Sequence, residues 1–308
     1  MKTIRKNRKL GLLVLLLIYA VAAIIGFITY QSLPSIPVLW RIFLSDVAAT
    51  IFVWLTGIAL KTASTYDPYW SVQTVTIGIF LLVDSNSWNL GNVIFTAALL
   101  IYSIRLTLNF VSTFDNLEYE DWRYKKLRKQ TGSFFYLVDL FGICLLPTAV
   151  VFFASIPYFT YLLNNFDFSG QELFGIFLIL LCVFIEYVSD KEMHEYIRNR
   201  KSRSSICRRG LWKNTRHPNY FGEIGVWGGV LLVYAVVYPG DWLAYIGFIL
   251  VYLLFRFISI PMAEVHYSSY KTGYKKYKRE TFALLILPFG KGFYKTVSAM
   301  QSEAIDHH

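Results

Sequence analysis

Residues 10–30 read LGLLVLLLIYAVAAIIGFITY and contain no charged side chain. A helix of about 20 apolar residues spans the roughly 30 Å hydrocarbon core of a bilayer, so this stretch predicts a transmembrane helix. The basic segment before it, residues 1–9, is also typical of a cleaved signal peptide, with Ala20 and Ala22 at the cleavage site. Because the apolar run continues to Tyr30, we favour an uncleaved anchor helix.

Seven further apolar segments follow along the chain. Of the 308 residues, 55% are hydrophobic and only 16% are charged, whereas about a quarter of the residues in a soluble domain are charged. We therefore predict an all-α fold, a polytopic membrane helix bundle with about eight transmembrane helices. The predicted spans are residues 10–30, 38–60, 69–83, 89–110, 134–162, 171–188, 220–238 and 241–259.

The distribution of Lys and Arg supports this topology, because short cytoplasmic loops are enriched in these residues. With the N-terminus placed inside, the inside segments hold 27 of the 30 Lys and Arg residues, and the outside turns hold none. We therefore expect both termini to be cytoplasmic. The protein is expected to be an integral, multi-pass protein of a bacterial inner membrane or of the endoplasmic reticulum.

The net charge of +10 follows from the same asymmetry, and topology and attraction to anionic lipid headgroups can explain it. The lipid bilayer is thus an expected partner. Nucleic acid is not, because no soluble module combines basic and aromatic residues. The three cysteines show no paired spacing, so neither a disulfide framework nor a zinc site is indicated. The oligomeric state stays open.

Polar residues within or beside apolar segments are the candidates for function. Tyr102 and Arg105 are spaced to share one helix face, either as an interfacial pair or as a phenol whose proton is made available beside a cation. Asp67, in TYDPYWS, either begins a helix ahead of Pro68 or places an acid at the membrane surface. The charged segment 114–132 is interpreted as a solvated connector or a short surface helix.

Glu186, Asp190 and His194 follow one another at four-residue steps where the sixth predicted helix leaves the membrane. This spacing predicts a polar stripe on one helix face. One helix supplies three ligands at most, so we do not expect a metal site.

The most distinctive segment is RRGLWKNTRHPNYFGEIGVWGG, residues 208–229. Its cations suit phosphate groups, and His217, Asn219 and Glu223 offer directional hydrogen bonds. Pro218 favours an extended His217 and can open a helix whose free backbone N–H groups lie beside the cations. A positively charged cytoplasmic loop without a ligand is the simpler alternative. The spacing of Gly225 and Gly229 indicates close helix packing.

Near the C-terminus, Glu264 lies where the eighth predicted helix leaves the membrane. Four tyrosines then recur at three- and four-residue steps and form an aromatic stripe: Tyr267, Tyr270, Tyr274 and Tyr277. Such a stripe is typical of an interfacial helix, and it can also stack on a planar ring of a ligand.

As a set, these motifs resemble the steroid 5-alpha-reductase family. The resemblance rests on GLWKNTRHPNYFGE (residues 210–223), on the E-x-x-x-D of Glu186 and Asp190, on IPMAE (residues 260–264), and on the tyrosines before Thr281. It is closest to a poorly characterised branch that also carries stretches like DPYWS and EDWRY. The similarity is strong over about residues 180–290 and weaker, but in order, over about 66–140.

The resemblance implies a membrane-embedded reductase that binds NADPH at the cytoplasmic ends of its C-terminal helices. Hydride then passes to a carbon–carbon double bond of a lipid-like enone, such as a steroid. The resemblance and the surrounding motifs nominate these cofactor-binding residues: Glu186, Asp190, Arg208, Trp212, Arg216, His217, Asn219, Tyr220, Glu223, Glu264, Tyr274 and Tyr277.

Two catalytic residues are nominated as well. Tyr102, in Y-x-x-R, is similar to the family's tyrosine that hydrogen-bonds the substrate carbonyl. The family's second substrate-binding group is a glutamate in an early helix, which has no convincing counterpart here, and Asp67 is nominated in its place. Hydride addition to an enone builds negative charge on the carbonyl oxygen, so a neutral phenol is a suitable donor.

The implied domain organisation has four parts. Residues 1–37 form an anchor helix and turn, 38–170 the helices of the substrate cavity, 171–292 the cofactor-binding helices and cytoplasmic loops, and 293–308 a tail.

Two other functions remain open from the sequence. One is a membrane methyltransferase of the isoprenylcysteine carboxyl methyltransferase type, which shares the RHP-x-Y motif and uses S-adenosylmethionine. The other is a lipid-binding membrane protein without catalysis. Asn219 and Glu223, together with DPYWS and EDWRY, favour the reductase.

Overall fold

A computed structural model of the chain describes residues 5–285. These residues form helices and connecting turns, with one isolated bridge between Thr215 and Phe282 and no strand among them. Six of the helices in this part of the chain are long and apolar enough to cross a membrane. The predicted all-α, multi-pass membrane fold is therefore confirmed. The count of eight spans and the cytoplasmic location of the termini stay predictions.

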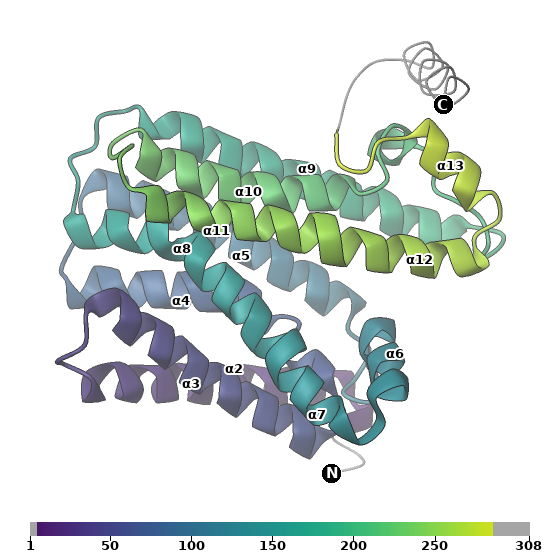
Figure 1. Cartoon of the computed structure of the whole chain (residues 1–308), viewed down its shortest axis with the longest axis horizontal. Helices are drawn as coiled ribbons and strands as arrows, with labels where there is room; N and C mark the ends of the chain where they lie inside the picture. Colours follow the sequence, from purple (N-terminus) through teal and green to yellow (C-terminus); the bar gives the residue numbers. More distant parts are fainter. Residues whose placement is uncertain (1–4, 286–308) are drawn as a thin grey trace, which may run out of the picture. The chain divides into compact units, whose positions relative to one another are not determined.

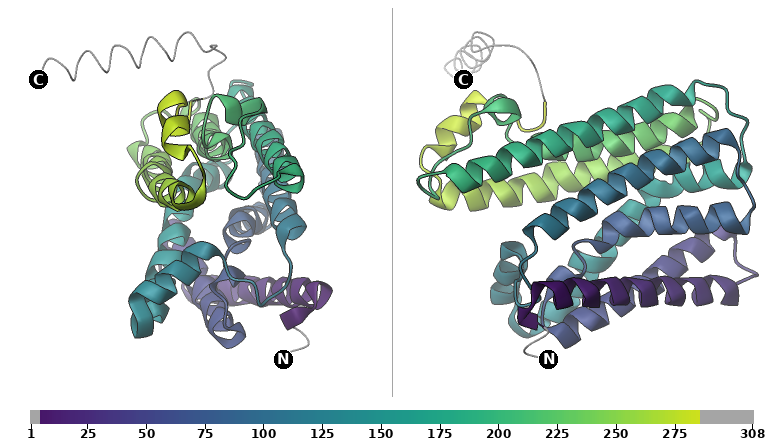
Figure 2. Two further views of the ribbon diagram at one scale, coloured as in Figure 1. Left: turned by 90° about the vertical axis from the view of Figure 1, so that its right-hand side faces the viewer. Right: turned by 180° about the vertical axis from the view of Figure 1, so that it is seen from behind.

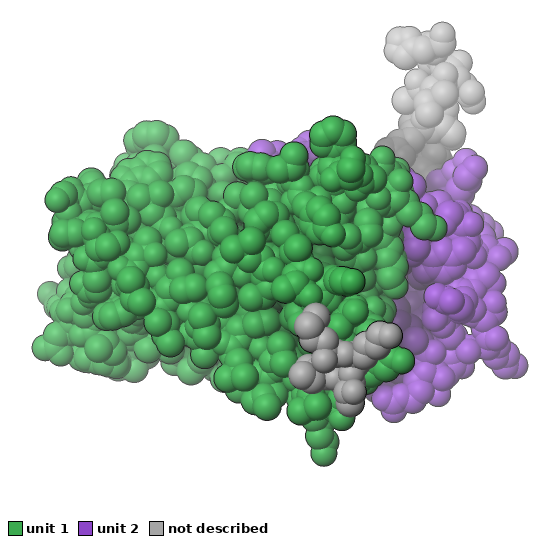
Figure 3. Space-filling view, turned by 90° about the horizontal axis from the view of Figure 1, so that it is seen from below, with its two compact units in different colours: residues 1–176, 229–250 green, residues 177–228, 251–308 purple. Residues whose placement is uncertain are grey.

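The chain divides into two compact units, which Figure 3 shows in different colours. Unit 1 comprises residues 1–176 and 229–250, and unit 2 comprises residues 177–228 and 251–308. Both units are built from segments that are distant in the sequence. The functional division at residue 170 stays a prediction, and the proposed tail 293–308 lies outside the described residues.

Unit 1 is a bundle of apolar helices (Figures 1 and 2). Helix α2 packs against α3, and α4 packs against both α5 and α8. Leu16 and Ile28 of α2 are more than half exposed, as expected for side chains that face lipid. The helices of this unit are α2 (Arg8–Ser32), α3 (Val38–Leu60), α4 (Tyr69–Asp84), α5 (Leu90–Thr113), α6 (Trp122–Thr131), α7 (Phe135–Val138) and α8 (Leu146–Asn164).

Buried hydroxyl groups join the helices of unit 1. Thr50 of α3 and Thr148 of α8 are hydrogen-bonded at 3.0 Å, and Tyr66 reaches the same Thr148 hydroxyl at 2.7 Å. Tyr158 of α8 donates to Thr96 of α5 at 2.9 Å. Apolar surface gives little net attraction between helices in lipid, so such bonds and close packing hold the bundle together.

Two helical stretches widen immediately before a proline. Residues 139–145 (η3) form a π-helical segment ahead of Pro147, and residues 254–259 (η5) form another ahead of Pro261. A proline ring displaces the carbonyl one turn earlier and donates no hydrogen bond, and a wider turn accommodates both effects. The helices therefore continue through both prolines and are longer than the predicted spans 134–162 and 241–259.

Unit 2 contains parts of three helices that it shares with unit 1, together with the loops and helices connected to them. Helices α9 (Glu172–Asn199), α10 (Pro218–Ala235) and α11 (Trp242–Leu253) are shared between the units. Helices α12 (Ile260–Tyr270) and α13 (Tyr274–Glu280) belong to unit 2 alone. Helix α10 begins at Pro218, as the sequence predicts.

Close packing of α9 and α10 within unit 2 depends on glycine. A Cβ atom at Gly225 would lie 2.3 Å from Cys182 Sγ, and one at Gly222 would lie 2.9 Å from the Cys182 carbonyl oxygen. The close packing expected at Gly225 is confirmed, and Gly222 extends it.

Candidate functional site

The loop before α10 is held to the segment after α13 by main-chain hydrogen bonds. The Arg216 amide donates to the Phe282 carbonyl at 2.9 Å, and the His217 amide donates to Ala283 at 3.1 Å. The Phe282 amide returns a bond to the Asn214 carbonyl at 3.2 Å. Together with the isolated bridge between Thr215 and Phe282, these bonds hold residues 214–217 against residues 282–283, directly ahead of Pro218.

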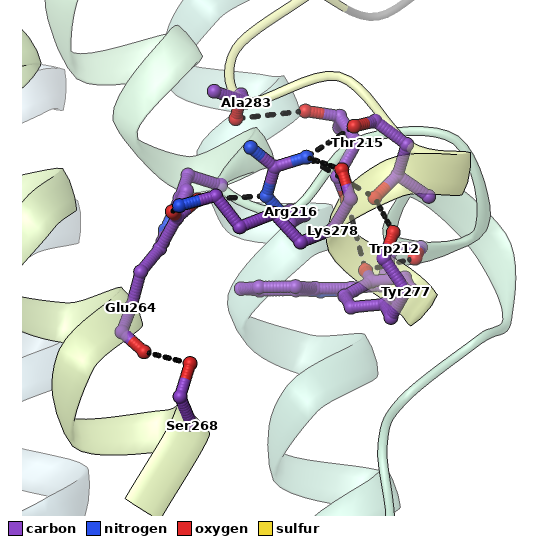
Figure 4. A network of polar contacts seen from close by, with 10 residues as sticks. Trp212, Thr215, Arg216, Glu264, Ser268, Tyr277, Lys278 and Ala283 are labelled. Atoms are coloured by element: carbon purple, nitrogen blue, oxygen red, sulfur yellow. Dashed lines mark hydrogen bonds and ion pairs between the residues drawn. The ribbon is translucent and has the colours of Figure 1, made fainter. Parts of the chain in front are cut away.

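Glu264 is the centre of a buried charge cluster (Figure 4). Its Oε1 accepts from Arg216 Nε at 2.7 Å, and its Oε2 lies 2.6 Å from Lys278 Nζ. The Glu264 side chain is 6% exposed and that of Arg216 is 7% exposed, whereas that of Lys278 is 55% exposed. Removal of one partner from such a buried pair leaves an uncompensated charge, which costs about 3–5 kcal/mol.

Arg216 is committed to the protein itself. In addition to Glu264, its NH1 donates to the carbonyl oxygens of Lys278, at 2.8 Å, and of Thr281. The guanidinium thereby ties α12 and the end of α13 to the loop before α10. Arg216 is therefore placed to shape the site, and its Nε and NH1 donors are occupied by protein acceptors.

His217 and Asn219 present unsatisfied polar atoms. His217 is 3% exposed, and burial lowers its pKa, so the neutral imidazole predominates at neutral pH. Its Nε2 lies 3.5 Å from Glu264 Oε1, too far for a good hydrogen bond, and has no closer partner among the described residues. The buried Oδ1 of Asn219 also has no partner within the described part of the chain. A ligand group or a water molecule can satisfy both atoms.

Aromatic rings extend the same segment. The His217 and Tyr220 rings stack with centroids 5.1 Å apart and planes 7° from parallel. Tyr220 in turn contacts Phe255 at a centroid distance of 4.9 Å. A flat, rigid ring pair next to buried polar atoms can orient a planar ligand.

A cavity of about 410 Å³ borders the charge cluster. Glu264 and Lys278 line it together with Pro261, Val265, Ser268 and Ser269. It is an open pocket at the surface, since Val265 and Lys278 on its wall are more than half exposed. Glu264 thus connects the cavity to Arg216 and His217.

Tyr277 of the aromatic stripe and Trp212 tie the loop before α10 to α13 and α9. The Tyr277 hydroxyl donates to the Trp212 carbonyl at 2.5 Å, and the Trp212 indole donates to the Ser189 carbonyl at 2.9 Å. Burial raises the pKa of Tyr277 and of Tyr274, so both phenols stay neutral. The expectation of one interfacial helix is wrong, because a turn at Gly273, with φ of +75°, separates α12 from α13.

Three of the predicted acidic residues, Glu186, Asp190 and Glu223, lie on α9 and α10. Glu186 and Glu223 are 1% and 5% exposed, and Asp190 is partly exposed. Glu223 Oε1 accepts from the Trp227 indole at 3.0 Å. Arg208, in the loop, is 45% exposed and pairs with Glu280 at 2.7 Å.

Sequence reasoning missed two polar contributors. Lys278 is one of several lysines in YKKYKRE, and nothing in the pattern distinguishes it from its neighbours. Glu192 accepts from the Leu211 amide at 2.9 Å and sits against Gly210, whose φ is +51°. Gly210, two residues before Trp212, was the available signal for a close approach of another side chain to this backbone.

The two nominated catalytic residues belong to unit 1. Tyr102 is 2% exposed on α5. Asp67 accepts a short hydrogen bond from Tyr124, which lies on α6 in the charged segment 114–132. Burial raises the pKa of Asp67 to about 6, although Arg123 and the Tyr124 hydroxyl oppose the shift. DPYWS and EDWRY therefore meet in space through Asp67 and Tyr124.

The structure thus joins Trp212, Arg216, Glu264 and Tyr277 in one network and places His217 beside it. Within residues 5–285, no group of three His, Cys, Asp or Glu side chains is arranged to hold a metal ion.

Comparison with known proteins identifies the family of this chain. Neither a curated protein nor a solved structure matches the chain. The model of the family described as "Protein of unknown function (DUF1295)" matches residues 53–281, a range that includes Asp67, Tyr102 and the whole Glu264 cluster. Since this match covers more than half of the chain, the protein belongs to the DUF1295 family.

Proposed function

We propose that this protein is a membrane-embedded, NADPH-dependent reductase of a carbon–carbon double bond in a lipid-like enone. The proposal starts from the resemblance of RHPNYFGE and its flanking motifs to the steroid 5-alpha-reductase family. One structural observation carries it furthest: the RHPN segment is fixed by the Arg216–Glu264 pair and leaves His217 Nε2 and Asn219 Oδ1 buried without hydrogen-bond partners among residues 5–285.

Residues in and around the Glu264 cluster have the chemistry that such a cofactor needs. NADPH combines anionic phosphates with planar rings that have polar edges. Lys278 and Arg208 are exposed cations, the His217–Tyr220 pair offers a flat aromatic surface, and the two unsatisfied atoms offer hydrogen bonds. NADPH, when bound, supplies the hydride.

The same fit refines the nominated residues. Asn219, His217 and Tyr220 are proposed to contact the cofactor. Arg216, Trp212 and Tyr277 are proposed to hold the walls, since Nε and NH1 of Arg216, the Trp212 indole and the Tyr277 hydroxyl donate to protein acceptors. Glu264 keeps Arg216 and Lys278 in place.

Tyr102 is proposed to act on the substrate. As hydride adds to the enone, negative charge develops on the carbonyl oxygen, and the Tyr102 hydroxyl would donate a hydrogen bond to it. Burial of Tyr102 in an apolar bundle would exclude water and strengthen this bond.

Two variants test the separate roles in detergent-purified protein. Asn219→Ala should weaken NADPH binding about tenfold, as expected for a lost hydrogen bond. Tyr102→Phe should lower kcat for enone reduction by about 10²–10³-fold and leave the Kd for NADPH nearly unchanged. Calorimetry gives the Kd, and NADPH absorbance gives the rate.

Tyr238→Phe is the matched control, because it removes an exposed phenol from the turn after α10. It should alter neither the Kd for NADPH nor the kcat for enone reduction. Loss of NADPH binding in Tyr102→Phe, with a normal thermal transition, would contradict the role assigned to Tyr102.

A further inference from the structure

A second cavity lies within unit 1, among α2, α3 and α4. Its volume is about 230 Å³. Most of its wall is apolar and includes Ala22, Phe27, Ile42 and Phe80. Phe27 is also about half exposed on the outer surface of α2, so the cavity lies beside the part of that helix that faces lipid.

Two buried polar side chains, Asp46 and Gln73, line this apolar cavity. Each is 4% exposed. Tyr69 donates to Asp46 Oδ1 at 3.1 Å, but Asp46 Oδ2 and both amide atoms of Gln73 have no hydrogen-bond partner among the described residues.

The Ser45 and Thr76 hydroxyl groups in the same wall do not supply these missing bonds. Ser45 donates to the Arg41 carbonyl at 2.7 Å, and Thr76 donates to the Val72 carbonyl at 2.9 Å. Both are thus occupied by their own helices. Unsatisfied buried polar groups are rare in proteins because each costs free energy, so the three free atoms call for an external partner.

We propose that this cavity binds a compact, membrane-soluble alcohol. A hydroxyl group can accept from Gln73 Nε2 and donate to Asp46 Oδ2, two of the three free atoms, which a ketone, an ether or a hydrocarbon cannot do at once. The apolar wall takes the carbon skeleton. A single water molecule meets the polar need but occupies only about 30 Å³ of the space.

The volume sets the size of the alcohol. An apolar cavity of about 150 Å³ holds benzene, so by proportion this cavity accepts on the order of ten non-hydrogen atoms. A monoterpene alcohol such as geraniol matches that size. This site requires neither NADPH nor reductase chemistry, so it stands or falls independently of the proposed function.

Equilibrium binding of tritiated geraniol to the full chain in phosphatidylcholine nanodiscs tests the proposal. We expect saturable binding of one molecule per chain above the partition into empty nanodiscs. Geranyl methyl ether and the parent hydrocarbon should compete about tenfold less well, because each leaves a buried group unpaired.

Variants locate the site. Gln73→Leu and Asp46→Leu should each weaken binding about tenfold. Thr76→Val, which changes the wall without removing a free polar atom, should bind as the unaltered chain does. Ala23→Phe, at an exposed lining position, should abolish binding by filling the cavity while both polar groups remain.

Geraniol should also raise the Tm of the unaltered chain and of Thr76→Val, but not that of Ala23→Phe. The proposal is overturned if no saturable binding is found, if the hydrocarbon competes as well as geraniol, or if Ala23→Phe binds normally.

Discussion

Arg216 and Glu264 lie 48 positions apart in the sequence and form the most buried ion pair of the Glu264 cluster. The resemblance to the steroid 5-alpha-reductase family and the surrounding motifs nominated both as cofactor-binding residues. It could not predict that they bind each other, since pairing depends on how α12 and the loop before α10 pack. The buried atoms of His217 and Asn219 that lack a hydrogen-bond partner in the described part of the chain are likewise visible only in three dimensions.

Asp67 gives a pH-dependent prediction at the residue scale. Its pKa is about 6 in the folded protein against 3.8 for the free side chain, chiefly because of burial. The folded state thus holds the proton more tightly, and this contribution to stability is lost as pH rises from about 4 through 6. The shift corresponds to about 3 kcal/mol.

Asp67→Asn lacks this titration. The free energy of unfolding of Asp67→Asn, relative to that of the unaltered chain, should therefore rise by about 2–3 kcal/mol between pH 4 and pH 7. Denaturant titration in detergent at both pH values measures it. If the difference in unfolding free energy between the two chains is constant across this range, burial does not destabilise the Asp67 carboxylate.

At the scale of elements, the sequence predicted the apolar helices well and their ends less well. The predicted span 38–60 coincides with α3, because an apolar run is bounded there by Pro37 and Lys61. The helical stretch 122–164 was predicted as a span only from residue 134, with a solvated connector or a short surface helix before it, and α6 confirms the surface-helix alternative. Its first part, WRYKKLRKQT, is too polar to read as a span, yet Asp121 caps it and buried Tyr124 anchors it.

Glycine packing between α9 and α10 yields a second stability prediction. Gly222→Ala would place Cβ 2.9 Å from the Cys182 backbone oxygen, which cannot move as a side-chain tip can. We expect a loss of about 1–3 kcal/mol in the free energy of unfolding, the usual cost of overpacking. Unfolding in mixed micelles, followed by circular dichroism, measures this loss.

Gly240→Ala is the control for this change, because a Cβ there meets no atom within 4 Å among the described residues. It should change stability by less than about 0.5 kcal/mol. Equal stability of the Gly222 and Gly240 variants would mean that α9 and α10 are not in tight contact.

For the whole molecule, composition and the Lys/Arg distribution were sufficient to predict a multi-pass helical membrane protein. They could not predict the two compact units, because each unit combines segments that are remote in the sequence. Hydropathy records which residues prefer lipid and not which helices pack together. The cavity with Asp46 and Gln73 escaped prediction for the same reason, since its walls come from three helices.

The central claim concerns the cofactor, and binding of NADPH is its most direct test. Calorimetric titration of the detergent-purified chain with NADPH, and separately with S-adenosylmethionine, distinguishes the reductase from the methyltransferase. The proposed function predicts saturable binding of one NADPH per chain and none of S-adenosylmethionine. Saturable binding of S-adenosylmethionine without binding of NADPH would contradict it.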